Sequence, residues 1–82
     1  MINILFFAQL REQLGTDTLN MPYEDNMTVA ILLAHLKAEN TQWQPILSSQ
    51  TLMVAVNQSM GNMSTPLCRG DEVAFFPPVT GG

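Results

Sequence analysis

The chain is poor in charged residues, and above all in positive ones. Only 12% of its 82 residues are charged, about half of the usual fraction. The three basic residues, Arg11, Lys37 and Arg69, lie far apart, and seven acidic residues give a net charge of −4. Because no basic cluster is present to follow a phosphate backbone, we expect no nucleic acid as a partner.

Cysteine, histidine and long apolar runs are equally scarce. Cys68 is the only cysteine, so an internal disulfide and a cysteine-rich metal site are excluded. We interpret Cys68 as an inert thiol and His35 as a residue of a helix boundary, and we expect no metal site. No apolar run approaches the roughly 20 residues that cross a bilayer, and no signal-peptide pattern is present. We therefore expect a cytoplasmic protein that does not bind membranes.

The remaining sequence contains several short segments with the period of two that is typical of strands. In residues 2–7, the two isoleucines share one face with Phe6, whereas Phe7 shares the other face with the polar Asn3. We therefore expect Phe7 to point outward. Further strands are predicted at residues 16–21, 52–56, 59–60 and 72–76, with turns at Asn57-Gln58 and Gly70-Asp71.

One segment has the clear pattern of an amphipathic helix. Its apolar residues follow the spacing i, i+3, i+4, i+7: Val29, Leu32, Leu33 and Leu36. Thr28 is suited to cap the first turn and Asn40 to end the helix. A short helical turn closed by Gly15 is expected at residues 8–14. Residues 41–51 are expected to form a loop that can include a short helical turn. Trp43, in this segment, is expected to pack as a lid on the core.

The predicted order of elements is β-β-α-β-β-β, with one main helix covering one face of a mixed sheet. This α+β order fits the β-grasp, or ubiquitin-like, fold better than a four-helix or βαβ arrangement. A chain of 82 residues allows one domain, which spans 1–82. The last strand is expected inside the sheet, with residues 77–82 as a projecting tail.

The C-terminal segment is the most informative part of the sequence. Its last strand runs through Pro77-Pro78-Val79-Thr80 into a terminal Gly81-Gly82. Prolines restrict φ and favour extended neighbours, so they predict a stiff arm. Glycines lack a Cβ, so a tip made of them can enter a narrow channel and bring a carboxylate close to a reacting group. We interpret this flexible diglycine tip as the active part of the chain.

Three groups of residues form a recognisable set. They are Phe6-Phe7-Ala8 with Arg11-Glu12 and Gly15, then Ala55-Val56-Asn57, and above all Gly70 to Val79 with the terminal diglycine. Together they resemble the small subunit of molybdopterin synthase, the sulfur carrier of molybdenum cofactor biosynthesis. The resemblance spans nearly the whole chain and is weakest at residues 41–51. Cys68 and Arg69 depart from it, because smaller or acidic polar residues are expected before Gly70.

The resemblance implies a specific chemistry at the tail. Gly82 is expected to be adenylated by an ATP-using enzyme related to ubiquitin-activating enzymes, and then converted to a thiocarboxylate. This group donates its sulfur to cyclic pyranopterin monophosphate in the large subunit of a heterotetrameric synthase. The chain is then a sulfur donor without a bound cofactor, and the catalytic groups belong to the large subunit. Gly81 and the tail residues Pro77, Val79 and Thr80 are expected to enter that partner.

An exposed apolar surface near the tail is expected to bind the large subunit. Phe7, Met60 and Phe75 are the candidates, and each fits an ordinary core position equally well, with Phe7 favoured as outward by Asn3. Arg11 is expected to pair with a carboxylate of the partner, with simple solvation as the alternative.

Three other functions use the same features. A sulfur carrier for the thiazole of thiamine shares the fold and the tail, but the double phenylalanine before Pro77 argues against it. A ubiquitin-like modifier would join Gly82 to lysines of other proteins, and a single lysine, Lys37, gives little capacity for chains. A plain interaction domain would keep its activity after deletion of Gly82.

Overall fold

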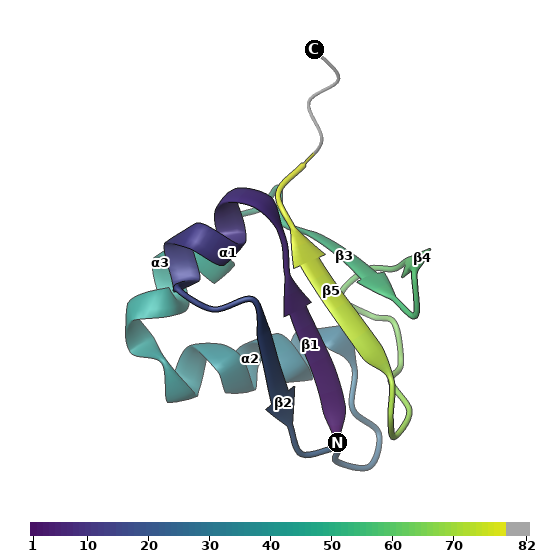
Figure 1. Ribbon diagram of the computed structural model, residues 1–82. Coiled ribbons are helices and arrows are strands. Elements are labelled where there is room, and N and C mark those ends of the chain that lie inside the picture. The colour runs from purple at the N-terminus through teal and green to yellow at the C-terminus, as the bar shows by residue number, and fades with distance from the viewer. Residues whose placement is uncertain (79–82) are drawn as a thin grey trace.

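A computed structural model describes residues 1–78, which form five strands, three α-helices and one 3-10 helix. In chain order these are β1 (Ile2–Phe6), α1 (Ala8–Leu14), β2 (Thr18–Met21), α2 (Val29–Glu39), the 3-10 helix η1 (Thr41–Trp43), α3 (Gln44–Leu47), β3 (Met53–Val56), β4 (Ser59–Met60) and β5 (Glu72–Phe76). Figure 1 shows the strands in front of α2 and α3. None of the helices in this part of the chain has the length and hydrophobicity to span a membrane.

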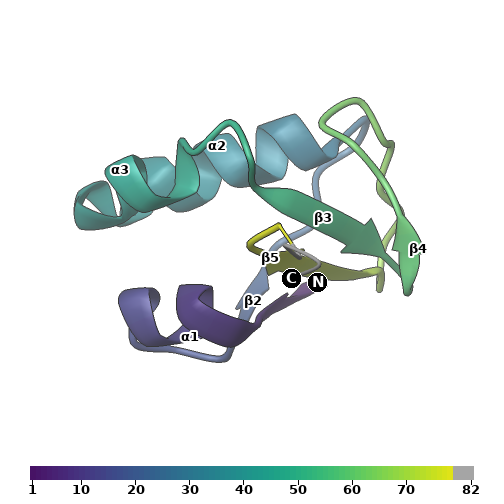
Figure 2. The ribbon, with the colours of Figure 1, turned by 90° about the horizontal axis from the view of Figure 1, so that it is seen from above.

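The strands form one mixed sheet in the order β2-β1-β5-β3-β4. β1 and β5 run parallel, and the other neighbouring strands are antiparallel. The last strand therefore lies inside the sheet, between β1 and β3, which confirms the prediction. Seen from above, α2 and α3 lie on one side of the sheet (Figure 2). The architecture is the predicted α+β, β-grasp fold.

The main helix begins and ends where the sequence predicts. The Thr28 hydroxyl oxygen accepts a hydrogen bond of 3.3 Å from the backbone N–H of Ile31, which satisfies one free donor of the first turn. The four predicted apolar residues of α2 are buried against the sheet. Full burial of such a side chain stabilises a fold by about 1.5–3 kcal/mol, so this face, more than helix propensity, holds α2 in place.

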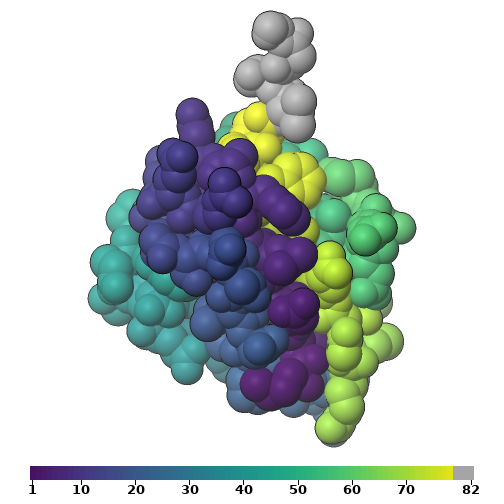
Figure 3. Space-filling model, viewed as in Figure 1, coloured from purple at the N-terminus to yellow at the C-terminus, as the bar shows by residue number. Residues whose placement is uncertain are grey.

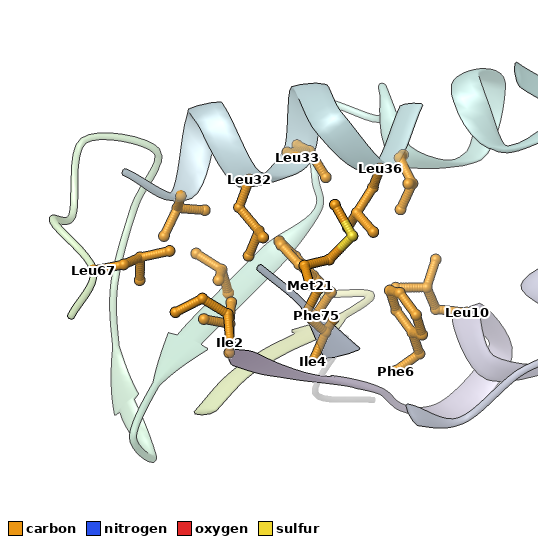
Figure 4. Close-up of a cluster of buried hydrophobic side chains, with 14 of the residues drawn as sticks. Ile2, Ile4, Phe6, Leu10, Met21, Leu32, Leu33, Leu36, Leu67 and Phe75 are labelled. Carbon is orange, nitrogen blue, oxygen red and sulfur yellow. The ribbon is translucent and has the colours of Figure 1, made fainter. Parts of the chain in front are cut away.

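The core lies between α2 and the inner face of the sheet (Figure 4). Ile2, Ile4 and Phe6 of β1 point into it and are at most 1% exposed. Phe6 stacks on Phe75 with 6.2 Å between ring centroids, and Trp43 meets Phe6 edge-on at 5.8 Å as the predicted lid. Phe75 is 0% exposed, so its prediction as a partner-binding residue is wrong. Its place beside Phe6 in the parallel pair sends its ring to the inner face.

Some elements differ in extent from their predictions. β2 begins at Thr18 rather than at residue 16, where the Thr16 hydroxyl donates to the carbonyl oxygen of Thr18 and forms a turn. β3 begins at Met53 because the N–H of Leu52 bonds to the carbonyl oxygen of Ser49. Residues 41–51 contain two successive helical turns, η1 and α3, so this segment is more helical than predicted.

Candidate functional site

The sheet face that α2 leaves uncovered carries a continuous row of apolar side chains. Because side chains alternate along a strand, the residues next to the buried ones point to this outer face. Leu5, Ala74 and Ala55 lie side by side there as cross-strand partners in β1, β5 and β3. Met60 of β4 extends the row as the partner of Ala55. Figure 3 shows this face, with β5 in yellow between β1 in purple and β3 and β4 in green.

A second apolar row lies nearer the end of β5. Met53 is paired there with Phe76, and both are half-buried. Phe7 directly follows β1 and is held to β5 by a backbone hydrogen bond of 3.1 Å. Phe7 is 46% exposed and Met60 is 62% exposed. The residues that we call the outer apolar patch are Leu5, Phe7, Met53, Met60 and Phe76.

The other end of the same face is polar. Asn3 has Asn20 and Glu72 as its cross-strand partners, and the two asparagines are exposed. The apolar side chains are thus concentrated where β5 runs into Pro77. A protein that covers the outer apolar patch therefore also reaches the start of the C-terminal segment.

Of the three apolar residues predicted to bind a partner, two lie on the outer face of the sheet and one lies in the core. Phe7 and Met60 are exposed on the outer face, as their candidate role requires, whereas Phe75 is in the core. Phe76 belongs to the patch, and sequence reasoning missed it. The signal was present in Glu72, which shares a face of β5 with Phe76 just as Asn3 shares a face of β1 with Phe7.

Comparison with known proteins identifies the family. Residues 4–82 match the ThiS family. The chain belongs to the ThiS family. It is 49% identical over 82 residues to the molybdopterin synthase sulfur carrier subunit of Escherichia coli (strain K12), with 100% of both chains covered. This relative confirms the predicted resemblance to the small subunit of molybdopterin synthase.

Solved structures of similar fold support the architecture of this ThiS-family chain. SAMP1 from Haloferax volcanii has a TM-score of 0.84 and 25% sequence identity, over 99% of this chain and 98% of that chain. The complex of subunits 1 and 2 of molybdopterin-converting factor from Helicobacter pylori 26695 contains a chain of similar fold. That match has a TM-score of 0.68 and 22% sequence identity, and it covers 99% of this chain and 97% of that chain. Both matches agree with the β-grasp fold.

Arg11 and the C-terminal residues complete the predicted site of this ThiS-family chain. Arg11 lies on the exposed side of α1, and no carboxylate of residues 1–78 forms an ion pair with it. Its pairing with a partner stays a prediction. Pro77 is half-buried at the end of the sheet. The predicted residues Val79, Thr80, Gly81 and Gly82 lie outside the described residues.

The other chemically active side chains of this ThiS-family chain lie away from the outer apolar patch. On α2, behind the sheet, His35 Nε2 lies 3.0 Å from Glu24 Oε2 at the surface. Cys68 is exposed before the start of β5, at the end of the sheet opposite Pro77. Within residues 1–78, no group of three histidine, cysteine or acidic side chains is placed to hold a metal ion.

Hollows in the surface also lie away from most of the patch. One has a volume of about 360 Å³ and lies between α2 and β3, with Lys37, Met53 and Met63 among its lining residues. A second, of about 80 Å³, lies between α1 and Pro77-Pro78, and a third, of about 170 Å³, lies beside Glu24, His35 and Glu39. The first hollow shares only Met53 with the outer apolar patch. We assign the candidate site to the patch because the patch is continuous with the C-terminal segment.

Proposed function

We propose that this chain is the sulfur carrier subunit of a molybdopterin synthase and that Gly82 carries the sulfur as a thiocarboxylate. The observation that carries the proposal is the 49% identity to the Escherichia coli sulfur carrier subunit over 100% of both chains. The outer apolar patch beside Pro77 supports it, since a carrier needs a docking surface next to its reactive end.

The chemistry requires activation of the terminal carboxylate. An α-carboxyl group has a pKa of about 3.3–3.7, so at neutral pH it is an anion and a poor electrophile. A carboxylate oxygen of Gly82 attacks the α-phosphorus of ATP, and pyrophosphate leaves. Hydrosulfide, HS⁻, from a sulfur source then attacks the carbonyl carbon and AMP leaves, so that one carboxylate oxygen is replaced by sulfur. The product is a thiocarboxylate, whose sulfur is a soft nucleophile that stays attached to a protein carrier. Because this step uses ATP, we place the protein in the cytoplasm.

The large subunit of the synthase is the partner that we assign to the outer apolar patch. Phe7, Met60 and Phe76 are the side chains proposed to be buried by it, because aromatic residues and methionine are enriched in protein interfaces. The complex of subunits 1 and 2 from Helicobacter pylori, whose matching chain has the same fold, supports this choice of partner. Docking there directs Pro77, Val79 and Thr80 into the partner and carries Gly82 to the cyclic pyranopterin monophosphate. The general acids, general bases and phosphate-binding groups then belong to the large subunit.

Intact-mass measurement tests the carrier role. The purified chain is incubated with ATP, the activating enzyme and a sulfur source, and a matched chain that ends at Gly81 serves as the control. We expect the full chain to gain the mass difference between sulfur and oxygen and the shortened chain to gain nothing. Transfer is then followed as the conversion of cyclic pyranopterin monophosphate by the complex with the large subunit. Full activity of the shortened chain would contradict the proposal.

A protein modifier is the second candidate, and the similarity to SAMP1, named a small archaeal modifier protein in a second solved structure, is the observation that favours it. The same incubation separates the two functions. A modifier forms an amide bond between Gly82 and a lysine of another protein, so the mass of a whole target protein is added. A thiazole-forming carrier gives the same thiocarboxylate but leaves the pyranopterin precursor unconverted.

A further inference from the structure

The motif Ala55-Val56-Asn57 leads into a turn that is held to β5 by hydrogen bonds of both the side chain and the backbone of Asn57. Asn57 and Gln58 have φ values of 51° and 70°, so both are left-handed, as in a two-residue type I′ hairpin. Asparagine is one of the few residues that tolerate this conformation. Figure 1 shows the turn between β3 and β4 beside the start of β5.

Both ends of the Asn57 side chain are engaged. Its Oδ1 accepts a bond of 3.0 Å from the N–H of Glu72, and its Nδ2 donates a bond of 2.9 Å to Oδ1 of Asp71. The amide orientation follows from its partners, since Glu72 offers a donor and the Asp71 carboxylate offers only acceptors. The Asn57 backbone N–H also donates to the carbonyl oxygen of Glu72 at 2.8 Å.

Asp71 connects this turn to a second one. Its Oδ2 accepts a bond of 2.7 Å from the N–H of Cys68, and its own N–H donates to the carbonyl oxygen of Cys68 at 3.1 Å. The carbonyl oxygen of Asp71 accepts from the N–H of Asn3 at 2.9 Å. The β3–β4 turn is therefore fastened, through Asn57 and Asp71, to the central strands β5 and β1.

β4 is held by this turn at one end and, at the other, by a backbone hydrogen bond of 3.0 Å from the N–H of Gly61 to the carbonyl oxygen of Val54. It consists of Ser59 and Met60 only, paired with Val56 and Ala55 at the edge of the sheet. Both residues are exposed, so burial contributes little to the position of β4. A short two-stranded hairpin is marginally stable by itself. With so few bonds in β4, the turn that precedes it contributes to the direction of the Met60 side chain.

We propose that Asn57 is a positioning residue for partner binding, which holds Met60 in the outer apolar patch through its bonds to Asp71 and Glu72. This inference rests on the proposed function, because it assumes that the large subunit docks on the patch. It also assigns a role to Asn57 and Asp71, which the sulfur chemistry does not use.

Exchange of the hydrogen-bonding pair tests the proposal. Asn57→Asp keeps the size of the side chain and an acceptor for Glu72 but sets two carboxylates against each other. Adding Asp71→Asn restores the pair with donor and acceptor exchanged, since the new amide donates to residue 57 and its oxygen still accepts from Cys68. We expect the single change to weaken binding of the large subunit by about five- to tenfold and the double change to restore affinity to within about twofold. No rescue by the double change would overturn the proposal.

A double-mutant cycle identifies Met60 as the residue through which Asn57 acts. In the Met60→Ala background, we expect Asn57→Asp to change affinity by less than about twofold, because the two changes remove the same contact. An equal loss in both backgrounds would overturn the role of Met60. Thermal unfolding of every variant ensures that the affinities refer to folded protein.

Methyl NMR of the free chain tests the positioning without the partner. We expect the Met60 methyl signal to shift in Asn57→Asp and to return in the double variant, while the Met21 methyl in the core stays in place. An unmoved Met60 signal would contradict the inference even if the partner still bound. Unchanged affinity in both Met60→Ala and Phe76→Ala would instead show that the large subunit does not dock on the outer apolar patch. The NMR measurement does not use the partner, so it would still test whether Asn57 positions Met60.

Discussion

Phe75 and Phe76 are neighbours in sequence but lie on opposite faces of β5. Phe75 is 0% exposed and stacks on Phe6, whereas Phe76 is half-buried beside Met53 on the outer face. A truncation at each position therefore has a different effect, although the two changes are chemically identical. The pair provides a matched control within the chain.

We expect Phe75→Ala to lower the free energy of unfolding by about 3–5 kcal/mol, because it removes a packed ring and leaves a cavity. Phe76→Ala is expected to lower it by less than about 1.5 kcal/mol, because the ring is already partly in water, and to weaken binding of the large subunit by about tenfold or more. Chemical denaturation and titration calorimetry measure the two quantities. A similar loss of stability in both variants would contradict the assignment of faces.

Arg11 is the exposed cation of α1, on a chain with a net charge of −4. Charges at the rim of an interface act mainly on the rate of association. We expect Arg11→Gln to lower the association rate of the large subunit at low salt by about two- to fivefold, with little change in dissociation. Stopped-flow measurements at two salt concentrations check this. A loss that persists unchanged at about 1 M salt would argue against an electrostatic role.

Among the elements, α2 illustrates how a single cap contributes to a helix. The Thr28 hydroxyl oxygen accepts a hydrogen bond from the N–H of Ile31, and four apolar side chains of α2 are buried against the sheet. We expect Thr28→Ala to lower the free energy of unfolding by about 1 kcal/mol. Thr41→Ala is the matched control, since the Thr41 side chain forms no hydrogen bond within residues 1–78, and it should change stability by less than about 0.5 kcal/mol. Equal effects in thermal or urea unfolding would contradict the capping role.

At the scale of the whole molecule, the proposal separates a folded body from a reactive end. The body, residues 1–78, supplies the docking surface, and Gly82 supplies the chemistry. We expect deletion of Gly82 to abolish sulfur transfer while changing the free energy of unfolding by less than about 0.5 kcal/mol, because no core residue is altered. A synthase assay and a denaturation curve on the same preparation measure both. A large loss of stability on deletion would contradict this separation.

Much of this fold follows from local patterns in the sequence. Alternation in residues 2–7 was sufficient to send Phe7 outward, and the spacing of leucines with Thr28 and Asn40 defined α2, because these signals depend on geometry within one element. The turn at Asn57-Gln58 followed from turn chemistry in the same way. The starts of β2 and β3 were misplaced, since their ends depend on the hydrogen bonds of Thr16 and Leu52.

The candidate site depended on contacts between distant segments. The motif of residues 70–82 was visible in the sequence, because a run of neighbouring residues needs no fold to identify it. Alternation from Glu72 indicated which face of β5 Phe76 shares, and the pairing of β5 with β1, across about 70 residues of chain, placed Phe76 beside the other residues of the patch. The fastening of Met60 through Asn57 and Asp71 likewise joins residues 14 positions apart. Sequence alone determined most of the elements and pointed to the proposed reactive end. The tertiary structure decided which apolar side chains lie together in the outer apolar patch, because the pairing of β1, β5, β3 and β4 joins segments that are distant in the chain.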